Sequence, residues 1–154
     1  MKKNILGVTL ARGGSKGIKN KNLTIINGKP LIYYTIKEAK KSKNITNYIV
    51  STDNDKIRNI AQKYKAEVPF IRPKKFSKDS SSSASALKHS LIKCEKYYNK
   101  KFDYVVELMA TNPLKSVNDI NNIIKILLKY NADSVIAVNQ LFDHHPARIK
   151  KIIK

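Results

Sequence analysis

The chain has 154 residues and a mass of 17.5 kDa, enough for one compact domain and too few for two ordinary ones. Hydrophobic residues make up 42% and charged residues 27%, a composition of globular and not of disordered proteins. No apolar run is long enough to span a bilayer, and the N-terminus lacks the apolar segment of a signal peptide. Cys94 is the single cysteine, which excludes an internal disulfide. We therefore expect a cytoplasmic protein without a membrane partner.

The charge is strongly positive, with 31 Lys and Arg against 11 Asp and Glu and a formal net charge of +20. Such a balance points to an anionic partner, which could be a nucleic acid, a membrane surface or a phosphorylated substrate. Only four of the 31 are arginines, and the lysines are scattered along the chain in short pairs instead of gathering on one element with aromatic residues. The pattern favours a solvated lysine surface over a nucleic-acid-binding face.

Apolar patterns predict strands and helices in alternation. Short runs of apolar or β-branched residues, some of them followed by Gly or Pro, predict strands. The predicted strands are residues 4–10, 48–52, 68–71, 104–108 and 134–138, and another strand is predicted to start within 149–153. Helical periodicity follows Pro30, Asp53, the serine run ending at Ser83, and Ser116. Asp53 is a candidate N-cap, and Ser116 with Asp119 resembles a capping box. We expect Cys94 in the core.

This alternation predicts an α/β fold, a mostly parallel sheet covered by helices on both faces, in one domain over residues 1–154. Ligands of such sheets bind beyond the carboxyl ends of the strands, where the strand order reverses. The candidate site therefore comprises the segments after Leu10, Thr52, Ile71, Leu108 and Val138.

The segment from Leu10 to Leu23 carries three glycines, a serine, an arginine and several lysines in the turn after the first strand. Glycines let backbone amides approach an anion, and consecutive amides can form a nest for it. Arg12 can bind two phosphate oxygens with its planar fork, while Lys16 and Lys21 supply point charges. The spacing matches neither a P-loop nor the G-x-G-x-x-G motif. A polyphosphate ligand is the favoured interpretation, and a tight turn with incidental lysines is the alternative.

The segment Leu-Ala-Arg-Gly-Gly-Ser-Lys-Gly-Ile, continued by Lys-Asn-Leu, resembles the signature of the acylneuraminate cytidylyltransferases. The resemblance continues through residues 49–53, Arg72-Pro73, Asp79 and the serines after it, 111–115 and 143–146, in the same order as in that family. It implies a Rossmann-like nucleotidyltransferase fold, usually dimeric. It also implies transfer of CMP from CTP to a nine-carbon keto-sugar acid, with release of pyrophosphate and a need for Mg²⁺.

The resemblance implies roles for individual residues. Arg12 and Lys21 would act on the phosphates during catalysis. The residues implied to bind the nucleotide are Leu10, Ala11, Arg12, Gly13, Ser15, Lys16, Asn22, Arg72, Ser81 and Ser83. The residues implied to face the sugar acid are Thr111, Asn112, His144 and His145. Asp79 could either orient the base-binding loop or cap the next helix.

The chain departs from the family pattern in two places. Met109 stands where the family commonly has a sugar-contacting glutamine, and Lys115 where it has an arginine, so a legionaminic or pseudaminic acid becomes a plausible substrate. The sequence also stops at Lys154, before the paired aspartates that hold the family's metal, so no metal ligand is identifiable here. We therefore expect a truncated cytidylyltransferase. The alternatives are a CTP-binding fragment with impaired catalysis and a basic nucleic-acid-binding protein.

Overall fold

A computed structural model describes residues 3–15 and 17–138 of the chain. Three parallel strands form its central sheet, β1 (Ile5–Leu10), β4 (Asn47–Ser51) and β5 (Tyr104–Glu107). They lie in the order β4-β1-β5, so that β1 pairs with β4 on one side and with β5 on the other. After β1 the chain first adds β4 on one side of it and later β5 on the other, so the strand order reverses at β1. This reversal places the expected ligand crevice at the carboxyl ends of β1 and β5.

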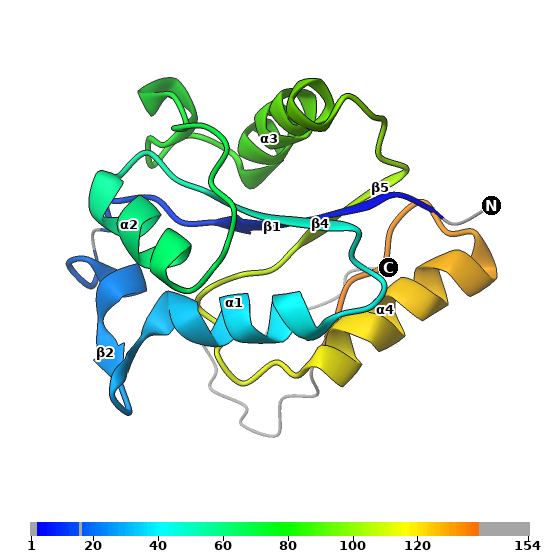
Figure 1. The fold of residues 1–154 in the computed structure, drawn as a ribbon, viewed down its shortest axis with the longest axis horizontal. Helices are drawn as coiled ribbons and strands as arrows, with labels where there is room; N and C mark the ends of the chain where they lie inside the picture. Colours follow the sequence, from blue (N-terminus) through cyan, green and yellow to red (C-terminus); the bar gives the residue numbers. More distant parts are fainter. Residues whose placement is uncertain (1–2, 16, 139–154) are drawn as a thin grey trace, which may run out of the picture.

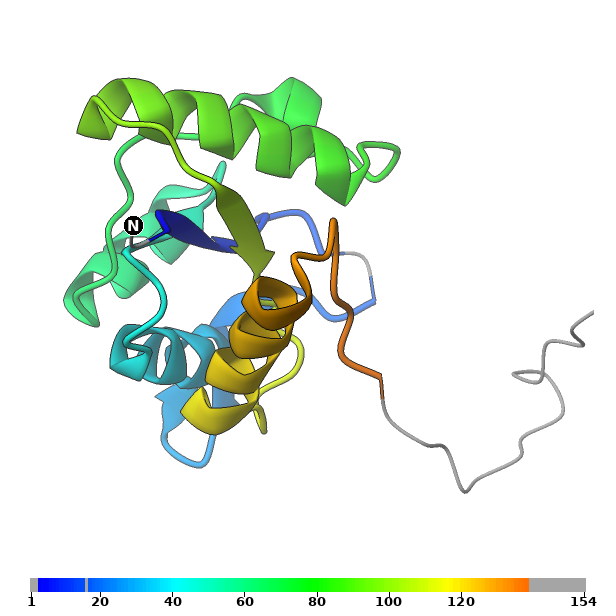
Figure 2. The ribbon, with the colours of Figure 1, turned by 90° about the vertical axis from the view of Figure 1, so that its right-hand side faces the viewer.

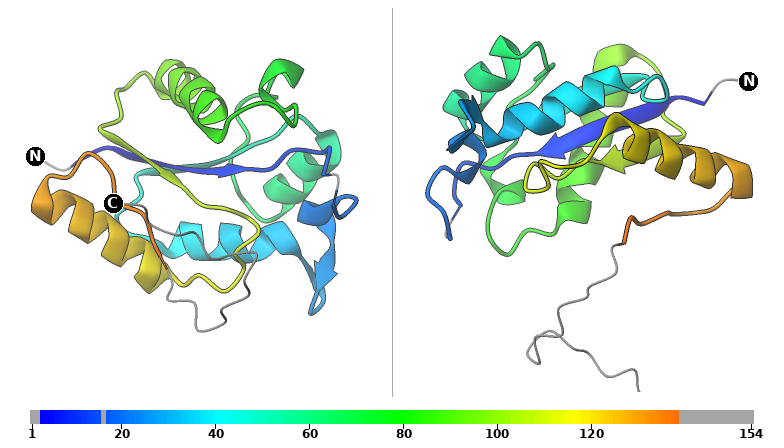
Figure 3. Two further views of the ribbon diagram at one scale, coloured as in Figure 1. Left: turned by 180° about the vertical axis from the view of Figure 1, so that it is seen from behind. Right: turned by 90° about the horizontal axis from the view of Figure 1, so that it is seen from below.

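Helices cover both faces of the sheet, as the sequence predicts (Figure 1). The helix α3 (Ser83–Tyr98) lies on one face. The other face is covered by α1 (Leu31–Lys41), α2 (Asp55–Lys63) and α4 (Val117–Tyr130). Figure 2 shows the sheet between α3 and the pair α1 and α4, and Figure 3 shows this pair side by side. In the described part of the chain, no helix combines the length and apolar character needed to cross a membrane.

The side chains of β1 point alternately to the two faces of the sheet, and each face has its own hydrophobic core. Ile5 packs in the cluster that includes Ile36 of α1 and Ile124 of α4. Leu6 and Val8 point the other way, into the cluster of α3. Cys94 is buried in this second core, which confirms the prediction, and burial raises the pKa of its thiol to about 12.

The N-caps of α3 and α4 agree with the sequence prediction, and the N-cap of α2 differs from it. Ser116 and Asp119 form the predicted capping box of α4, and Ser82, inside the serine run, caps α3. The prediction that Asp53 caps α2 is wrong, because Asn54 holds that position and accepts a hydrogen bond from the Ile57 N–H at 3.1 Å. Asp53, one residue earlier, is turned toward the loop after β1 instead.

Two predicted strands are absent from the described structure. Residues 68–71 make no ladder: one isolated parallel bridge joins Ile71 to Thr52, and a second joins the preceding Glu67 to Ile49. Pro69 between them has no N–H to donate, which prevents a continuous ladder. Residues 134–138 pair with no strand, and Ile136 and Val138 are 80% and 90% exposed, because apolar composition alone does not supply a hydrogen-bonding neighbour. The predicted start at 149–153 lies outside the described residues.

A small hairpin and two short 3-10 helices complete the described structure. The hairpin joins β2 (Ile25–Ile26) to β3 (Lys29–Pro30), with Asn27 at φ 47° and Gly28 at φ 75°. Positive φ at both central positions is typical of the tight turns that connect antiparallel strands. The 3-10 helices span Lys21–Leu23 and Lys74–Phe76 and lie in the two loops that border the candidate site.

Candidate nucleotide-binding site

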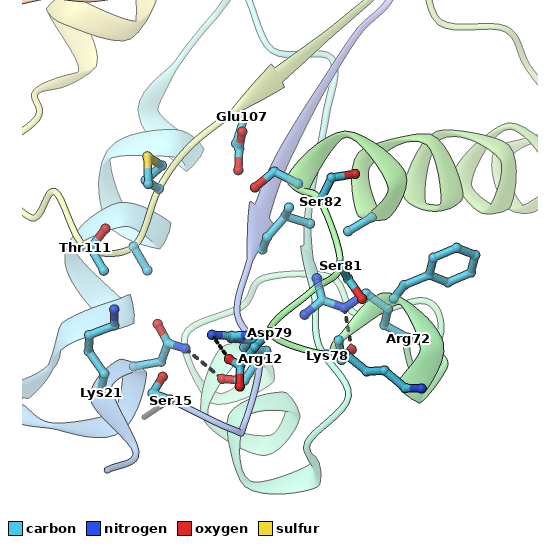
Figure 4. A pocket seen from close by; sticks show the side chains of 18 of the residues that line it. Arg12, Ser15, Lys21, Arg72, Lys78, Asp79, Ser81, Ser82, Glu107 and Thr111 are labelled. Atoms are coloured by element: carbon cyan, nitrogen blue, oxygen red, sulfur yellow. Dashed lines mark hydrogen bonds and ion pairs between the residues drawn. The ribbon is translucent and has the colours of Figure 1, made fainter. Parts of the chain in front are cut away.

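A cavity of about 420 Å³ opens at the carboxyl ends of β1 and β5, where the strand order predicts the ligand (Figure 4). Its walls come from the loop after β1, the segment before α3, the first turn of α3 and the end of β5. The lining residues that the sequence singled out are Leu10, Arg12, Ser15, Lys21, Asn22, Arg72, Asp79, Ser81, Ser83, Met109 and Thr111. Residues from far apart in the chain therefore meet in one cavity.

Hydrogen bonds from the neighbouring strand hold the loop after β1 in place. The Ala11 N–H donates to the Ser51 carbonyl at 3.0 Å, and the Gly13 N–H donates to the Asp53 carboxylate at 3.0 Å. The buried Asn22 amide donates to the Arg12 carbonyl at 3.1 Å from the far end of the loop. These bonds fix the backbone on both sides of the Arg12 side chain.

A glycine is required at position 13 because the loop lies so close to Asn54, and not because of an unusual φ. A Cβ built at this position would lie 2.7 Å from the Asn54 Nδ2 and 2.9 Å from the Asn54 Cβ. Asn54 cannot easily yield, because its side chain caps α2. Gly14 has no atom within 4 Å of such a Cβ, so the two adjacent glycines serve different purposes. The first lets the loop pack onto the start of α2.

Arg12 forms an ion pair across the cavity with Asp79, at 2.6 Å between Nη2 and Oδ1. Both side chains remain partly exposed, so solvent screens the pair and its contribution to stability is small. Its effect is geometric, because it links the loop after β1 to the segment that precedes α3. Of the two roles predicted for Asp79, orienting this loop agrees with the contact, while the cap of α3 is Ser82.

Arg72 is the buried cation of the site, with 3% of its surface exposed. Its backbone N–H donates to the Thr52 carbonyl at 2.7 Å, and its side-chain Nε donates to the Ser77 hydroxyl at 2.9 Å. Burial lowers the pKa of Arg72; Asp53 acts in the opposite direction, and Arg12 lowers it further. An arginine remains charged through such a shift. A fixed cation with guanidinium donors therefore lines the cavity.

Serine hydroxyls surround the start of α3. The Ser81 hydroxyl donates to the Lys75 carbonyl at 2.8 Å, and the Ser82 hydroxyl accepts from the Ser85 N–H at 3.2 Å. Ser83, the first residue of α3, lines the cavity beside them. Ser82 lines the cavity as well, although the sequence analysis did not single it out.

The other predicted residues divide into three groups. Ala11 and Gly13 support the loop without lining the cavity, since Ala11 is buried in the core. Asn112 is exposed and does not line it either, while Thr111 does. Lys16, His144 and His145 lie outside the described residues.

Lys115 holds the turn that follows β5. Its ammonium donates to the Thr35 hydroxyl at 2.8 Å, to the Met109 carbonyl at 2.7 Å and to the Asn112 carbonyl. Burial lowers the pKa of Lys115 to about 8. In this chain the lysine therefore organises the backbone that carries Thr111.

Sequence reasoning missed several residues of the cavity wall, and these are Phe76, Ser77, Lys78, Ser82, Ala86 and Glu107. Glu107 is the last residue of β5, so the rule that ligands bind beyond strand ends could have found it. The others come from the irregular segment between Arg72 and α3, which no pattern marked.

The described residues do not form a recognisable metal site. No group of three or more His, Cys, Asp or Glu side chains that could hold an ion occurs in residues 3–15 and 17–138. Asp53 and Asp79 are both engaged, with a backbone amide and with Arg12. The dependence on Mg²⁺ that the resemblance implies stays a prediction.

The parallel sheet covered by helices on both faces, with the glycine-containing loop and the cationic cavity at its strand ends, defines a domain of the Rossmann-like class. The model of the family described as "Cytidylyltransferase" matches residues 6–150. The chain belongs to the cytidylyltransferase family, and the resemblance found in the sequence is confirmed.

Named relatives agree with this assignment. The chain is 37% identical over 132 residues to the post-translational flagellin modification protein B of Campylobacter coli, covering 86% of this chain and 56% of that protein. It is 38% identical over 109 residues to the CMP-N,N'-diacetyllegionaminic acid synthase of Campylobacter jejuni, covering 71% and 46%. The chain thus spans about half the length of these curated relatives.

A solved structure confirms the predicted fold class. A CMP:2-keto-3-deoxy-manno-octonic acid synthetase, solved as a complex with CTP, superposes with a TM-score of 0.71. The match covers 84% of this chain and 49% of that one, at 19% identity. At that identity the likeness concerns the fold alone.

Proposed function

We propose that this chain supplies the CTP-binding part of an enzyme that transfers CMP from CTP to a nonulosonic sugar acid. The observation that carries the proposal is the convergence of Arg12, Lys21 and Arg72 on one cavity at the carboxyl ends of the strands. Three cations with hydroxyl donors suit a triphosphate better than a single carboxylate, because they can neutralise several charges. The family and the relatives named after CMP-sugar-acid synthesis support the same chemistry.

In the proposed reaction a hydroxyl oxygen of the sugar acid attacks the α-phosphorus of CTP. The new bond joins this oxygen to phosphorus, the bond to the β-phosphate bridging oxygen breaks, and pyrophosphate leaves while the hydroxyl proton passes to solvent. Arg12 and Lys21 would stabilise the charge on the phosphates, and Ser15 would orient them. Such reactions depend mostly on positioning and charge stabilisation.

Arg72, Ser81 and Ser83, with Leu10, would form the part of the cavity that receives the base. Thr111, on the turn held by Lys115, would face the sugar acid. The legionaminic acid relative makes an acid of that type the first substrate to test.

Calorimetric titration with CTP tests the nucleotide site. We expect binding by the wild type and a loss of at least tenfold in affinity in Arg12→Ala, because the planar fork contributes charge-assisted hydrogen bonds. The matched control is Arg58→Ala, since Arg58 lies on α2 outside the cavity and pairs with Asp55. Equal losses in both variants would indicate a general charge effect and contradict a specific site.

Turnover is tested separately, by pyrophosphate release with CTP and legionaminic, pseudaminic or neuraminic acid, in the presence and absence of Mg²⁺. Release with one of these acids supports the transferase. CTP binding without release under any condition would instead favour the second candidate, a nucleotide-binding chain with impaired catalysis, a reading consistent with the missing metal cluster among the described residues.

A further inference from the structure

Glu107 brings a second carboxylate, besides the Asp79 that pairs with Arg12, into a cavity lined by cations. It ends β5, and it is paired in register with Val8 of β1. Side chains alternate along a strand, so Glu107 points to the same face as Val105, which packs in the core beneath α3. In Figure 4 it lies on the wall toward Ser82, at the end of the cavity away from Ser15 and Lys21.

The Glu107 carboxylate has no partner within the described chain. Among residues 3–15 and 17–138, Glu107 and Asp133 are the only carboxylates with neither a hydrogen bond nor an ion pair. Both side chains are exposed, but Asp133 lies in the segment after α4, whereas Glu107 lines the cavity, where partial desolvation raises the pKa of its carboxyl. Burying part of a charged group is unfavourable unless something pairs with it. The structure therefore leaves a hydrogen-bond acceptor inside the cavity for a ligand donor.

The position of the carboxylate indicates which part of a nucleotide it meets. A triphosphate would be repelled by Glu107 and attracted to Arg12 and Lys21 at the other end of the cavity. Besides these cations and Glu107, the cavity lining includes the apolar side chains of Leu10 and Ala86 and the guanidinium of Arg72. This combination suits a flat heterocycle with polar edges, so the base would lie at the Glu107 end.

We propose that Glu107 selects cytosine over uracil by accepting a hydrogen bond from the exocyclic amino group of the base, an inference that rests on the proposed function. Cytosine carries an amino donor at position 4, and uracil carries a carbonyl oxygen there. A carboxylate accepts from the first and repels the second. Donors such as Arg72 can serve the ring oxygen that both bases share, so Glu107 is the residue that distinguishes them.

The test compares calorimetric affinities for CTP and UTP in the wild type, Glu107→Gln, Glu107→Leu and the control Asp133→Asn. The ratio of the two affinities is the informative quantity, because both nucleotides share the triphosphate contacts. We expect the wild type and the control to prefer CTP. We expect Glu107→Leu to reduce this preference by about tenfold, as loss of one base-specific contact does. An amide can present either N–H or C=O, so Glu107→Gln should bind both nucleotides about equally.

Three outcomes overturn the inference in distinguishable ways. An unchanged CTP to UTP ratio in Glu107→Leu means that the carboxylate does not read the base. An effect that disappears when EDTA replaces Mg²⁺ means that Glu107 acts through a divalent cation. Absence of binding of either nucleotide by the folded wild type means that the proposed function itself fails. Circular dichroism of each variant, with the isosteric Glu107→Gln as the conservative change, separates these results from misfolding.

Discussion

The two adjacent glycines of the loop after β1 allow a sharp test of how the site is built. Replacing Gly13 by alanine would place a Cβ 2.7 Å from the Asn54 Nδ2 and 2.9 Å from the Asn54 Cβ. The second contact is with an atom next to the backbone, so a rotation of the side chain cannot relieve it. Either the loop moves away from Asp53, or Asn54 gives up its cap of α2.

Each of these adjustments has a known order of magnitude. Overpacking of this kind costs about 1–3 kcal/mol, and loss of an N-cap costs about 1 kcal/mol. Since either adjustment relieves the clash, we expect Gly13→Ala to lower the free energy of unfolding by about 1–3 kcal/mol, measured by urea denaturation with far-ultraviolet circular dichroism. CTP affinity should fall as well, because the same shift displaces the backbone that orients Arg12.

Gly14→Ala is the matched control for stability. Its Cβ would meet nothing within 4 Å, so it should remain within about 0.5 kcal/mol of the wild type or be slightly more stable, since alanine restricts the unfolded chain. Removing the Asn54 Cβ with Asn54→Gly should rescue Gly13→Ala, so that the double variant is less destabilised than the sum of the single ones. Equal effects at the two glycines, or strict additivity in the double variant, would refute the reasoning.

Three further predictions concern the rest of the fold. Ser116→Ala should lower stability by about 1 kcal/mol by removing the capping box of α4; a thermal melt indistinguishable from the wild type would contradict this. Ile124→Ala, at a fully buried position, should lower the free energy of unfolding by about 2–5 kcal/mol in urea denaturation. A loss of stability below about 1 kcal/mol would mean that neighbouring side chains fill the space left by the isoleucine. Lys115 has its folded pKa lowered to about 8 from 10.5, so the unfolded state binds more protons between these values. The wild type should therefore gain stability relative to Lys115→Met as pH rises from about 8 to 10.5, and a constant difference would show that the amine is not desolvated.

The sequence predicted the parts of the fold that depend on local pattern. The strand β1 is an almost continuous apolar run broken only by Thr9, as expected of a strand buried on both faces, and the capping box at Ser116 needs only residues three apart. Residues 68–71 and 134–138 are also apolar, yet they form no strands. Strand formation depends on a neighbour with free backbone groups, and this information lies elsewhere in the chain.

The site was predictable to the extent that strand ends and a specific motif mark it. Arg12 and Arg72 follow apolar runs and do line the cavity. The contact between Arg12 and Asp79 joins residues 67 positions apart, and no local pattern encodes it. The exchange of roles between Asp53 and Asn54 is equally hidden, because both residue types cap helices and only the three-dimensional structure decides which one faces Gly13.

The acidic side chains near the cavity explain how so basic a site can fold before an anion binds. Burial is the main cause of the lowered pKa of Arg72, and the positive charge of Arg12 lowers it further, so the two cations repel each other. Asp53 offsets part of that repulsion while it holds the Gly13 amide, and Asp79 does so while it pairs with Arg12. A phosphate that reaches Arg12 would replace one anion by another, so the guanidinium is already oriented and little ordering remains to be done on binding. The affinity for a phosphate would then depend on how much better Arg12 binds the phosphate than the Asp79 carboxylate. The phosphate is favoured because it would also contact Lys21 and Ser15, which line the same cavity.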